Sequence, residues 1–171
     1  MRKNVRTVIV SSDAPGLGTL LQKGVGVRGR GGESVRHFLE REVGLAPEYV
    51  EQSVRTIFLN CAPADDIDAL TVADGDVLSL SAAMPGLVGI AMGRNTLVSG
   101  FRSGISAKPG EVREGDALLT VKMFNLVARD AGPELLGRGV FLKAGQIRVA
   151  LGENAPDNLP DDDEEVLLQT Q

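Results

Sequence analysis

Two short stretches that combine glycine with arginine carry the clearest binding chemistry in the chain. Residues 93–95 read Gly-Arg-Asn and residues 100–104 read Gly-Phe-Arg-Ser-Gly. A guanidinium group donates paired hydrogen bonds to a phosphate or carboxylate, and neighbouring glycines leave backbone N–H groups accessible to the same anion. Arg94 and Arg102 are therefore candidate anion-binding residues. Neither stretch matches the phosphate-binding loop or the dinucleotide-binding fingerprint.

The same segment is also rich in apolar residues, which offers a second interpretation. Its large apolar side chains are Leu87, Val88, Ile90, Met92 and Phe101. Such a density of apolar groups suits a protein core or a subunit interface better than a solvated loop. We therefore predict that residues 84–104 are buried in a core or between subunits, with the anion site as the alternative.

Cys61 and His37 are the only residues of their types, and we predict no catalytic role for either. Acidic residues closely follow Cys61, and a nearby negative charge disfavours the reactive thiolate. His37 has no serine or cysteine partner that a motif could assign, and one titratable group is not a catalytic set. We interpret His37 as a residue on the surface or edge of a helix.

Five aspartates between positions 65 and 76 could in principle offer oxygen ligands to Ca²⁺ or Mg²⁺. These residues are Asp65, Asp66, Asp68, Asp74 and Asp76. Their spacing does not match the twelve-residue calcium loop. Aspartate and glycine also favour turns, because the short carboxylate bonds to nearby backbone groups. We predict turns here, with no metal and no cofactor.

Composition limits the class of protein. At 171 residues the chain fits one medium domain or two small ones. One cysteine excludes an intramolecular disulfide and a cysteine-rich zinc site. With five Phe, one Tyr and no Trp, the core must consist mainly of aliphatic side chains.

Charge and the lengths of the apolar runs argue against two kinds of partner. Residues 1–60 hold nine Lys/Arg and six Asp/Glu, whereas residues 61–171 hold nine and seventeen. A net charge of −5 disfavours non-specific binding to nucleic acid, which needs clustered cations. No apolar run is long enough to span a bilayer, and the first residues lack the apolar centre of a signal peptide. We therefore expect a cytoplasmic protein without nucleic-acid or membrane partners.

The strongest helical pattern covers residues 35–43. Its apolar stripe consists of Val35, Phe38, Leu39 and Val43. Ser34 is a suitable N-cap, and Gly44 can adopt the left-handed conformation that ends a helix. We expect this stripe to pack on a sheet.

Strand patterns occur in several places. Residues 5–10, 54–59 and 77–81 are rich in β-branched or alternating apolar residues, and residues 112–121 repeat an acidic turn that leads into a strand. We further predict a return strand within residues 20–27. Residues 140–143 and 146–151 suggest a hairpin about Ala144-Gly145.

The order helix, strand, acidic segment, Asp74-Gly75-Asp76 turn and strand over about residues 33–81 resembles a known family. It is similar to the β-grasp, or ubiquitin-like, sulfur carriers, such as the small subunit of molybdopterin synthase and the thiamine-pathway carrier. Asn60-Cys61 stands where that family usually has Asn-Gly. The resemblance implies an α+β protein with a β-grasp-like N-terminal half, residues 1–83. We expect a β-rich second half, 84–152, packed on the first, and a flexible acidic tail, 153–171.

The family's chemistry requires a terminal Gly-Gly whose carboxylate is activated. Here the corresponding residues 84–89 are internal. The expected function is therefore that of a non-catalytic interaction or assembly protein, whose partner is another protein or a second copy of the chain. The alternative is an enzyme component for sulfur transfer or for binding a small anionic ligand through residues 86–104.

Overall fold

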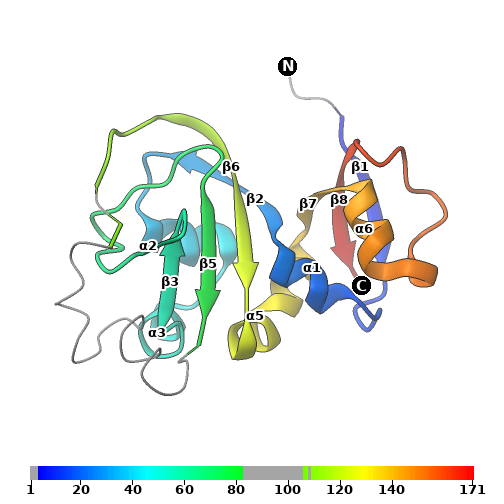
Figure 1. Ribbon diagram of the computed structural model, residues 1–171, viewed down its shortest axis with the longest axis horizontal. Helices are drawn as coiled ribbons and strands as arrows, with labels where there is room; N and C mark the ends of the chain where they lie inside the picture. Colours follow the sequence, from blue (N-terminus) through cyan, green and yellow to red (C-terminus); the bar gives the residue numbers. More distant parts are fainter. Residues whose placement is uncertain (1–3, 83–105, 108) are drawn as a thin grey trace.

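A mixed sheet of eight strands forms the centre of the computed structural model, which describes residues 4–82, 106–107 and 109–171 (Figure 1). The strands are β1 (Arg6–Val10), β2 (Val25–Gly31), β3 (Thr56–Leu59), β4 (Ala62–Pro63), β5 (Val77–Ser81), β6 (Gly115–Met123), β7 (Val140–Lys143) and β8 (Glu165–Thr170). Their order in the sheet is β1-β8-β7-β2-β6-β5-β3-β4. This combination of helices with a mixed sheet agrees with the predicted α+β class.

Helices connect and cover these strands. They are α1 (Leu17–Lys23), α2 (Val35–His37), the π-helix η1 (Phe38–Val43), α3 (Pro47–Gln52), α5 (Asn125–Arg138), α6 (Ala144–Leu151) and the 3₁₀ turn η3 (Gly152–Asn154). None of the helices in the described part of the chain has the length and apolar character needed to cross a bilayer.

The sheet consists of two groups of strands that meet at one point. β2, β6, β5, β3 and β4 form one group, and β7, β8 and β1 form the other (Figure 1). The groups are joined by the single pair Gly26↔Phe141 between β2 and β7. A Cβ on Gly26 would lie 2.9 Å from the carbonyl oxygen of Phe141, so the absent side chain at this position permits the two strands to approach.

The predicted helix over residues 35–43 is confirmed. The Ser34 hydroxyl accepts a hydrogen bond from the His37 N–H at 3.0 Å, and Gly44 ends the helix with a φ of 87°. The apolar stripe is buried, and Phe38 packs against Gly29 of β2. The sheet beneath this helix includes β3 and β5, as predicted.

The strands predicted over residues 5–10, 54–59, 77–81 and 112–121 are present as β1, β3, β5 and β6. β6 lies between β2 and β5, antiparallel to β2 and parallel to β5. An inner strand of the first group is therefore supplied by the second half of the chain.

The return strand predicted within residues 20–27 is wrong for its first part, because residues 17–23 form helix α1. Leu17, Leu20 and Leu21 are buried at the spacing of one helix face. Gly24, with a φ of 116°, ends the helix while its N–H bonds to the Leu20 carbonyl. β2 begins at the next residue and pairs with β6 rather than with β1.

The hairpin predicted over residues 140–151 is also wrong. β7 is followed directly by helix α6, which buries Ala144, Ile147 and Leu151 on one face. The Gln146 side chain accepts a hydrogen bond from the Lys143 N–H at 2.9 Å and so stabilises the start of the helix. Helices α5 and α6 have 14 and 8 residues, whereas strands β6 and β7 have 9 and 4. More of the described residues between 84 and 152 are therefore helical than in strands, and the prediction of a β-rich segment is corrected for them.

The flexible tail predicted over residues 153–171 is wrong for its last part. Glu165–Thr170 forms β8, which is parallel to β1 and antiparallel to β7. Val166 and Leu168 are fully buried between these neighbours and the helices. The predicted boundary at residue 83 does not match the division of the sheet, because β1 lies in one group with β7 and β8, and β6 lies in the other group with β2 and β5.

Candidate functional site

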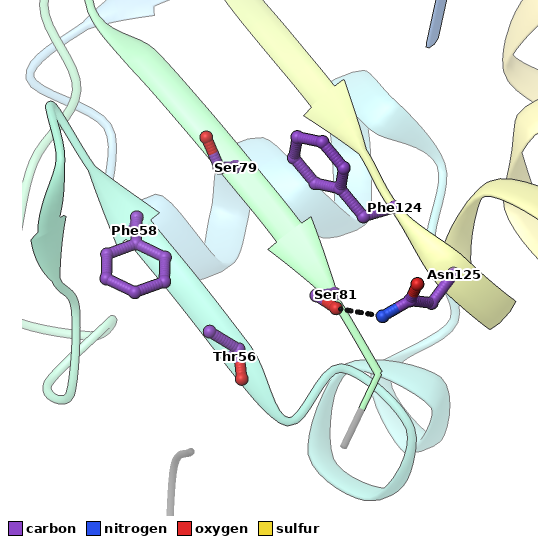
Figure 2. A pocket seen from close by; sticks show the side chains of 6 residues that line it. All are labelled: Thr56, Phe58, Ser79, Ser81, Phe124 and Asn125. Atoms are coloured by element: carbon purple, nitrogen blue, oxygen red, sulfur yellow. Dashed lines mark hydrogen bonds between the residues drawn. The ribbon is translucent and has the colours of Figure 1, made fainter. Parts of the chain in front are cut away.

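A cavity of about 300 Å³ lies where β3 begins and where β5 and β6 end, beside the start of helix α5 (Figure 2). Two neighbouring strands and the β6–α5 junction supply its described walls. The residues are Thr56 and Phe58 of β3, Ser79 and Ser81 of β5, and Phe124 and Asn125 at the junction. Four polar side chains and two phenyl rings thus line one cavity.

The two strands place their side chains in this cavity through their alternation. Successive residues of a strand point to opposite faces of the sheet. Ile57, Leu78 and Leu80 therefore enter the core. The residues between them face the other way, and the register pairs Thr56 with Ser81 and Phe58 with Ser79.

The junction between β6 and α5 completes the site. The Phe124 N–H donates a hydrogen bond to the Leu80 carbonyl at 3.0 Å and holds the end of β6 beside β5. Asn125 has a φ of 54°, and its Nδ2 donates to the Ser81 hydroxyl at 3.1 Å. Figure 2 shows the Phe58 and Phe124 rings on either side of β5, with the Ser81–Asn125 hydrogen bond at its end.

Thr56 is the buried polar residue of this cavity. It is 1% exposed, and its Oγ1 has no hydrogen-bond partner among the described residues. A buried hydroxyl that lacks a partner loses the hydrogen bonds it made to water and gains none in return. Such an atom needs an explanation in a folded protein.

The described lining can bind a ligand but holds no catalytic set. Its polar groups are hydroxyls and one amide, and none of the six side chains is charged. A hydroxyl nucleophile needs an adjacent general base, and no described lining residue can act as one. The chemistry that the described lining offers is therefore hydrogen bonding and aromatic contact.

The turn between β3 and β4 is a second well-ordered feature. Asn60 and Cys61 have positive φ values of 51° and 70°, the combination required by a tight type I′ turn. Asn60 Nδ2 donates to Asp76 at 2.9 Å, and its Oδ1 accepts from the Val77 N–H at 2.8 Å. Cys61 is exposed and forms no disulfide, and its role at this position is to complete the tight turn.

Replacing Cys61 with glycine should increase the free energy of unfolding by about 1 kcal/mol, because a non-glycine side chain is strained by roughly 1–2 kcal/mol in the left-handed region. Chemical denaturation of the two proteins measures the difference. Cys61→Ala retains a Cβ and should change the stability by less than about 0.5 kcal/mol. Equal stabilisation by alanine and glycine would show that backbone strain is not the cause.

The five aspartates make separate contacts within the fold. Asp65 accepts a hydrogen bond from Ser106 at 2.6 Å, and Asp66 accepts from the Ala69 N–H at 3.1 Å. Asp68 pairs with Arg36. In the described residues, no three His, Cys, Asp or Glu side chains gather closely enough to hold a metal ion.

Two of these aspartates anchor the turn before β5. Asp74 accepts a hydrogen bond from the Leu118 N–H at 2.8 Å, and Asp76 accepts from the Ala73 N–H at 2.8 Å. Gly75 has a φ of 86° and donates its N–H to the Leu118 carbonyl. The predicted Asp-Gly-Asp turn is confirmed, and it fastens β5 to β6.

Arg36 joins the helix to two other segments, whereas its neighbour His37 is exposed as predicted. The guanidinium lies 2.6 Å from Asp68 and 2.5 Å from Glu51. Hydrogen bonding to Asp68, and then to Glu51, raises the pKa of Arg36 above its ordinary value despite partial burial. This network is structural, because its carboxylates are already occupied by the arginine.

Tyr49, the only tyrosine, should titrate with a pKa of about 12. Burial raises the pKa, and the nearby Asp130 carboxylate, which accepts a hydrogen bond from the phenol at 3.2 Å, raises it further. Absorbance near 295 nm reports this group alone, because the chain has no tryptophan. Asp130→Asn should lower the pKa only part of the way toward 10, since burial remains.

The sign of the linked stability effect follows from the raised pKa. A group that holds its proton more tightly when folded stabilises the protein below its unfolded pKa, and this contribution is lost as the pH rises through the folded pKa. The Tyr49 contribution should therefore be complete below pH 10 and disappear between about pH 10 and 12. Far-UV circular dichroism during the titration establishes that the chain is still folded. A folded chain whose Tyr49 titrates near 10 contradicts its burial beside Asp130.

The residues predicted to bind an anion or to form an interface lie outside the described residues. They are Arg94, Arg102, Leu87, Val88, Ile90, Met92 and Phe101. Both interpretations of this segment remain predictions.

Sequence reasoning did not identify the cavity. The pattern that could have indicated it is the alternation of Thr56 and Phe58 in β3, and of Ser79 and Ser81 in β5, with buried apolar residues. The pattern shows which residues share one face of a strand, but not that β3 and β5 pair with Thr56 opposite Ser81.

Comparisons with family models, with curated proteins and with solved structures find no match for this chain.

Proposed function

We propose that this chain is a non-catalytic interaction or assembly protein built on a β-grasp scaffold. Its partner is another protein or a second copy of the chain, and it contacts the face of β3 and β5 opposite α2 and η1. The proposal includes a cytoplasmic location, with which the unpaired Cys61 is compatible.

The order of the first group of strands supports the scaffold. A β-grasp unit has a hairpin, a helix across the sheet and further strands, and its first and last strands are parallel neighbours in the centre. Here β6 is antiparallel to β2 and parallel to β5, while the helix of residues 35–43 follows β2. The five strands of this group therefore have the neighbours expected in a β-grasp unit. The strand in the position of the unit's first strand is β6, which follows the other four in the chain.

This order bears on the sulfur-carrier alternative. In that family the free tail directly follows the last strand of the unit. In this chain β5 occupies that position, and the chain later returns to the same sheet as β6. A unit that needs residues beyond β5 to complete its own sheet has no free carboxylate at that point, which favours an interaction role.

The observation that carries the proposal is the set of side chains that β3 and β5 present opposite their helix-covered face. Phe58 is partly exposed beside Ser79. The cavity that both residues line contains no catalytic set among its described residues. Aromatic side chains with hydroxyl neighbours are typical of the surfaces through which proteins recognise one another. Binding is the activity that this surface supports.

Ser79→Glu tests the proposal, because a charge placed beside Phe58 should disrupt a contact made by this face. Val149→Glu is the control, since Val149 is 74% exposed on α6, which follows β7 of the other group of strands. Quantitative affinity capture from the native source, together with light scattering of the pure protein, measures partner binding and self-association.

We expect a stoichiometric partner or a defined oligomer that Ser79→Glu abolishes and Val149→Glu retains. Melting curves of both variants establish that they are folded. A monomer that captures no stoichiometric partner, or an assembly that tolerates Ser79→Glu as well as it tolerates Val149→Glu, contradicts the proposal.

A further inference from the structure

We propose that the cavity lined by Thr56, Ser81 and Asn125 binds a neutral aromatic group that carries a hydrogen-bonding atom. The inference goes beyond the proposed function, since it concerns the contents of the cavity and holds whichever protein contacts the sheet face. The same ring could belong to a free small molecule or to a partner's side chain. Its shared chemistry is an uncharged ring with a hydroxyl, amide or ring N–H.

The unmet hydrogen bond of Thr56 is the first argument. Its Oγ1 has no partner among the described residues, although the residue is 1% exposed. Ser81 lies opposite it in the register, but the hydrogen bond of the Ser81 hydroxyl is to Asn125 Nδ2, at 3.1 Å, and Thr56 Oγ1 makes none with the described residues. A polar atom of a ligand in the cavity would supply the hydrogen bond that the fold leaves unmade.

The aromatic walls are the second argument. Phe58 and Phe124 come from different segments and line the same cavity, one on each side of β5 (Figure 2). Phenyl rings offer a large apolar surface and prefer to meet another ring edge-to-face or offset-stacked. A flat ring can therefore contact both walls while a polar atom on its rim reaches the hydroxyls.

The absence of charge among the described lining residues is the third argument. A charged ligand loses much hydration free energy on entering such a cavity and needs an opposite charge in return. The six described walls provide hydroxyls, one amide and phenyl rings, with no ionised group. This composition favours a neutral ligand and disfavours a phosphate or carboxylate.

The size of the cavity limits the ligand. At about 300 Å³ it is at the lower end of the range that small-molecule sites occupy. One ring system with its substituent fits this volume better than a nucleotide or a dinucleotide cofactor. The expected occupant is therefore a single aromatic group.

A pair of probes tests the hydrogen bond separately from the aromatic contact. Phenol and benzene share a ring, but only phenol can bond to Thr56, and benzoate adds a charge. Binding to the full chain is measured by NMR shifts of the backbone amides of β3 and β5. Thr56→Val removes the hydroxyl with little change in shape, and Thr120→Val makes the same change on β6 outside the described lining of the cavity.

We expect phenol to bind more tightly than benzene to the natural chain, and benzoate to bind more weakly than either. Thr56→Val should reduce the preference for phenol about fivefold, the equivalent of one ordinary hydrogen bond of roughly 1 kcal/mol. Thr120→Val should leave the preference unchanged. Unfolding midpoints of the two valine variants establish that both are folded.

Three results would overturn the inference. The first is a preference for phenol that survives Thr56→Val, because the hydroxyl would then take no part. The second is tighter binding of benzoate than of phenol. The third is the absence of saturable shifts in β3 and β5 with any probe, which would leave Thr56 bonded to a trapped water or to nothing.

The source of the natural ring is determined on protein isolated from its native source. A small aromatic molecule released on denaturation and identified by mass spectrometry indicates a free ligand. A copurifying protein that excess phenol displaces indicates a partner's side chain. Both outcomes place a neutral ring in the cavity, and the second also links the cavity to the proposed partner.

Discussion

Replacing Phe38 with alanine should lower the free energy of unfolding by about 3–5 kcal/mol, the usual cost of removing a fully buried phenyl ring. Phe38, the first residue of η1, is 0% exposed in the core. A Cβ on Gly29 would lie 2.7 Å from the ring, so no other side chain separates the ring from the backbone of β2. The loss combines the transfer of the ring to water with the cavity that it leaves.

Chemical denaturation measures the effect, and Val149→Ala is the control. Val149 is 74% exposed, so its truncation should change the stability by less than about 0.5 kcal/mol. Gly29→Ala adds a check on geometry. It should destabilise the natural chain through a clash with the ring, and destabilise the Phe38→Ala chain less, because the two residues are coupled by contact. A small effect of Phe38→Ala would disprove burial of the helix on β2.

Replacing Gly16 with alanine should cost about 3 kcal/mol, because two penalties apply at one position. Gly16 has a φ of 99°, which strains any residue with a side chain. A Cβ there would also lie 2.1 Å from the Ala150 carbonyl oxygen, which is backbone of α6 and cannot rotate away. Helix α1 would have to move from α6, at an overpacking cost of roughly 1–3 kcal/mol.

Gly75→Ala separates the two penalties. Gly75 has a similar φ of 86°, but no described atom lies within 4 Å of its added Cβ. Its replacement should cost only the strain of roughly 1–2 kcal/mol. Equal losses for Gly16→Ala and Gly75→Ala in denaturant titrations would show that the start of α1 is not packed tightly on α6.

Local patterns predicted some elements correctly, and their chemistry explains why. Ser34 and Gly44 flank an apolar stripe at helical spacing, so the cap, the buried face and the end of the helix all lie within eleven residues. The Asp74-Gly75-Asp76 turn is equally local, because its glycine and carboxylates satisfy nearby backbone groups. Such elements need little information from the rest of the fold.

Other predictions failed where glycine and acidic residues obscured a short apolar pattern. The glycines between residues 24 and 32 hide the boundary between one element and the next, whereas the spacing of Leu17, Leu20 and Leu21 already indicates helix α1. The acidic run 161–165 suggested a flexible tail, although Val166 and Leu168 alternate as strand residues do. Only their burial between β1, β7 and the helices makes six residues into a stable strand.

The sequence by itself determined the helix of residues 35–43, the turn before β5, the main strands of the first group and the aliphatic core. Only the tertiary structure decided that β6 enters the sheet between β2 and β5 and that β8 joins β1 to β7. It also decided that Thr56, Phe58, Ser79 and Phe124 meet around one cavity. The physical reason is that strand pairing depends on backbone hydrogen bonds between distant segments, which almost any side chain permits, so its register is set by burial of the whole sheet.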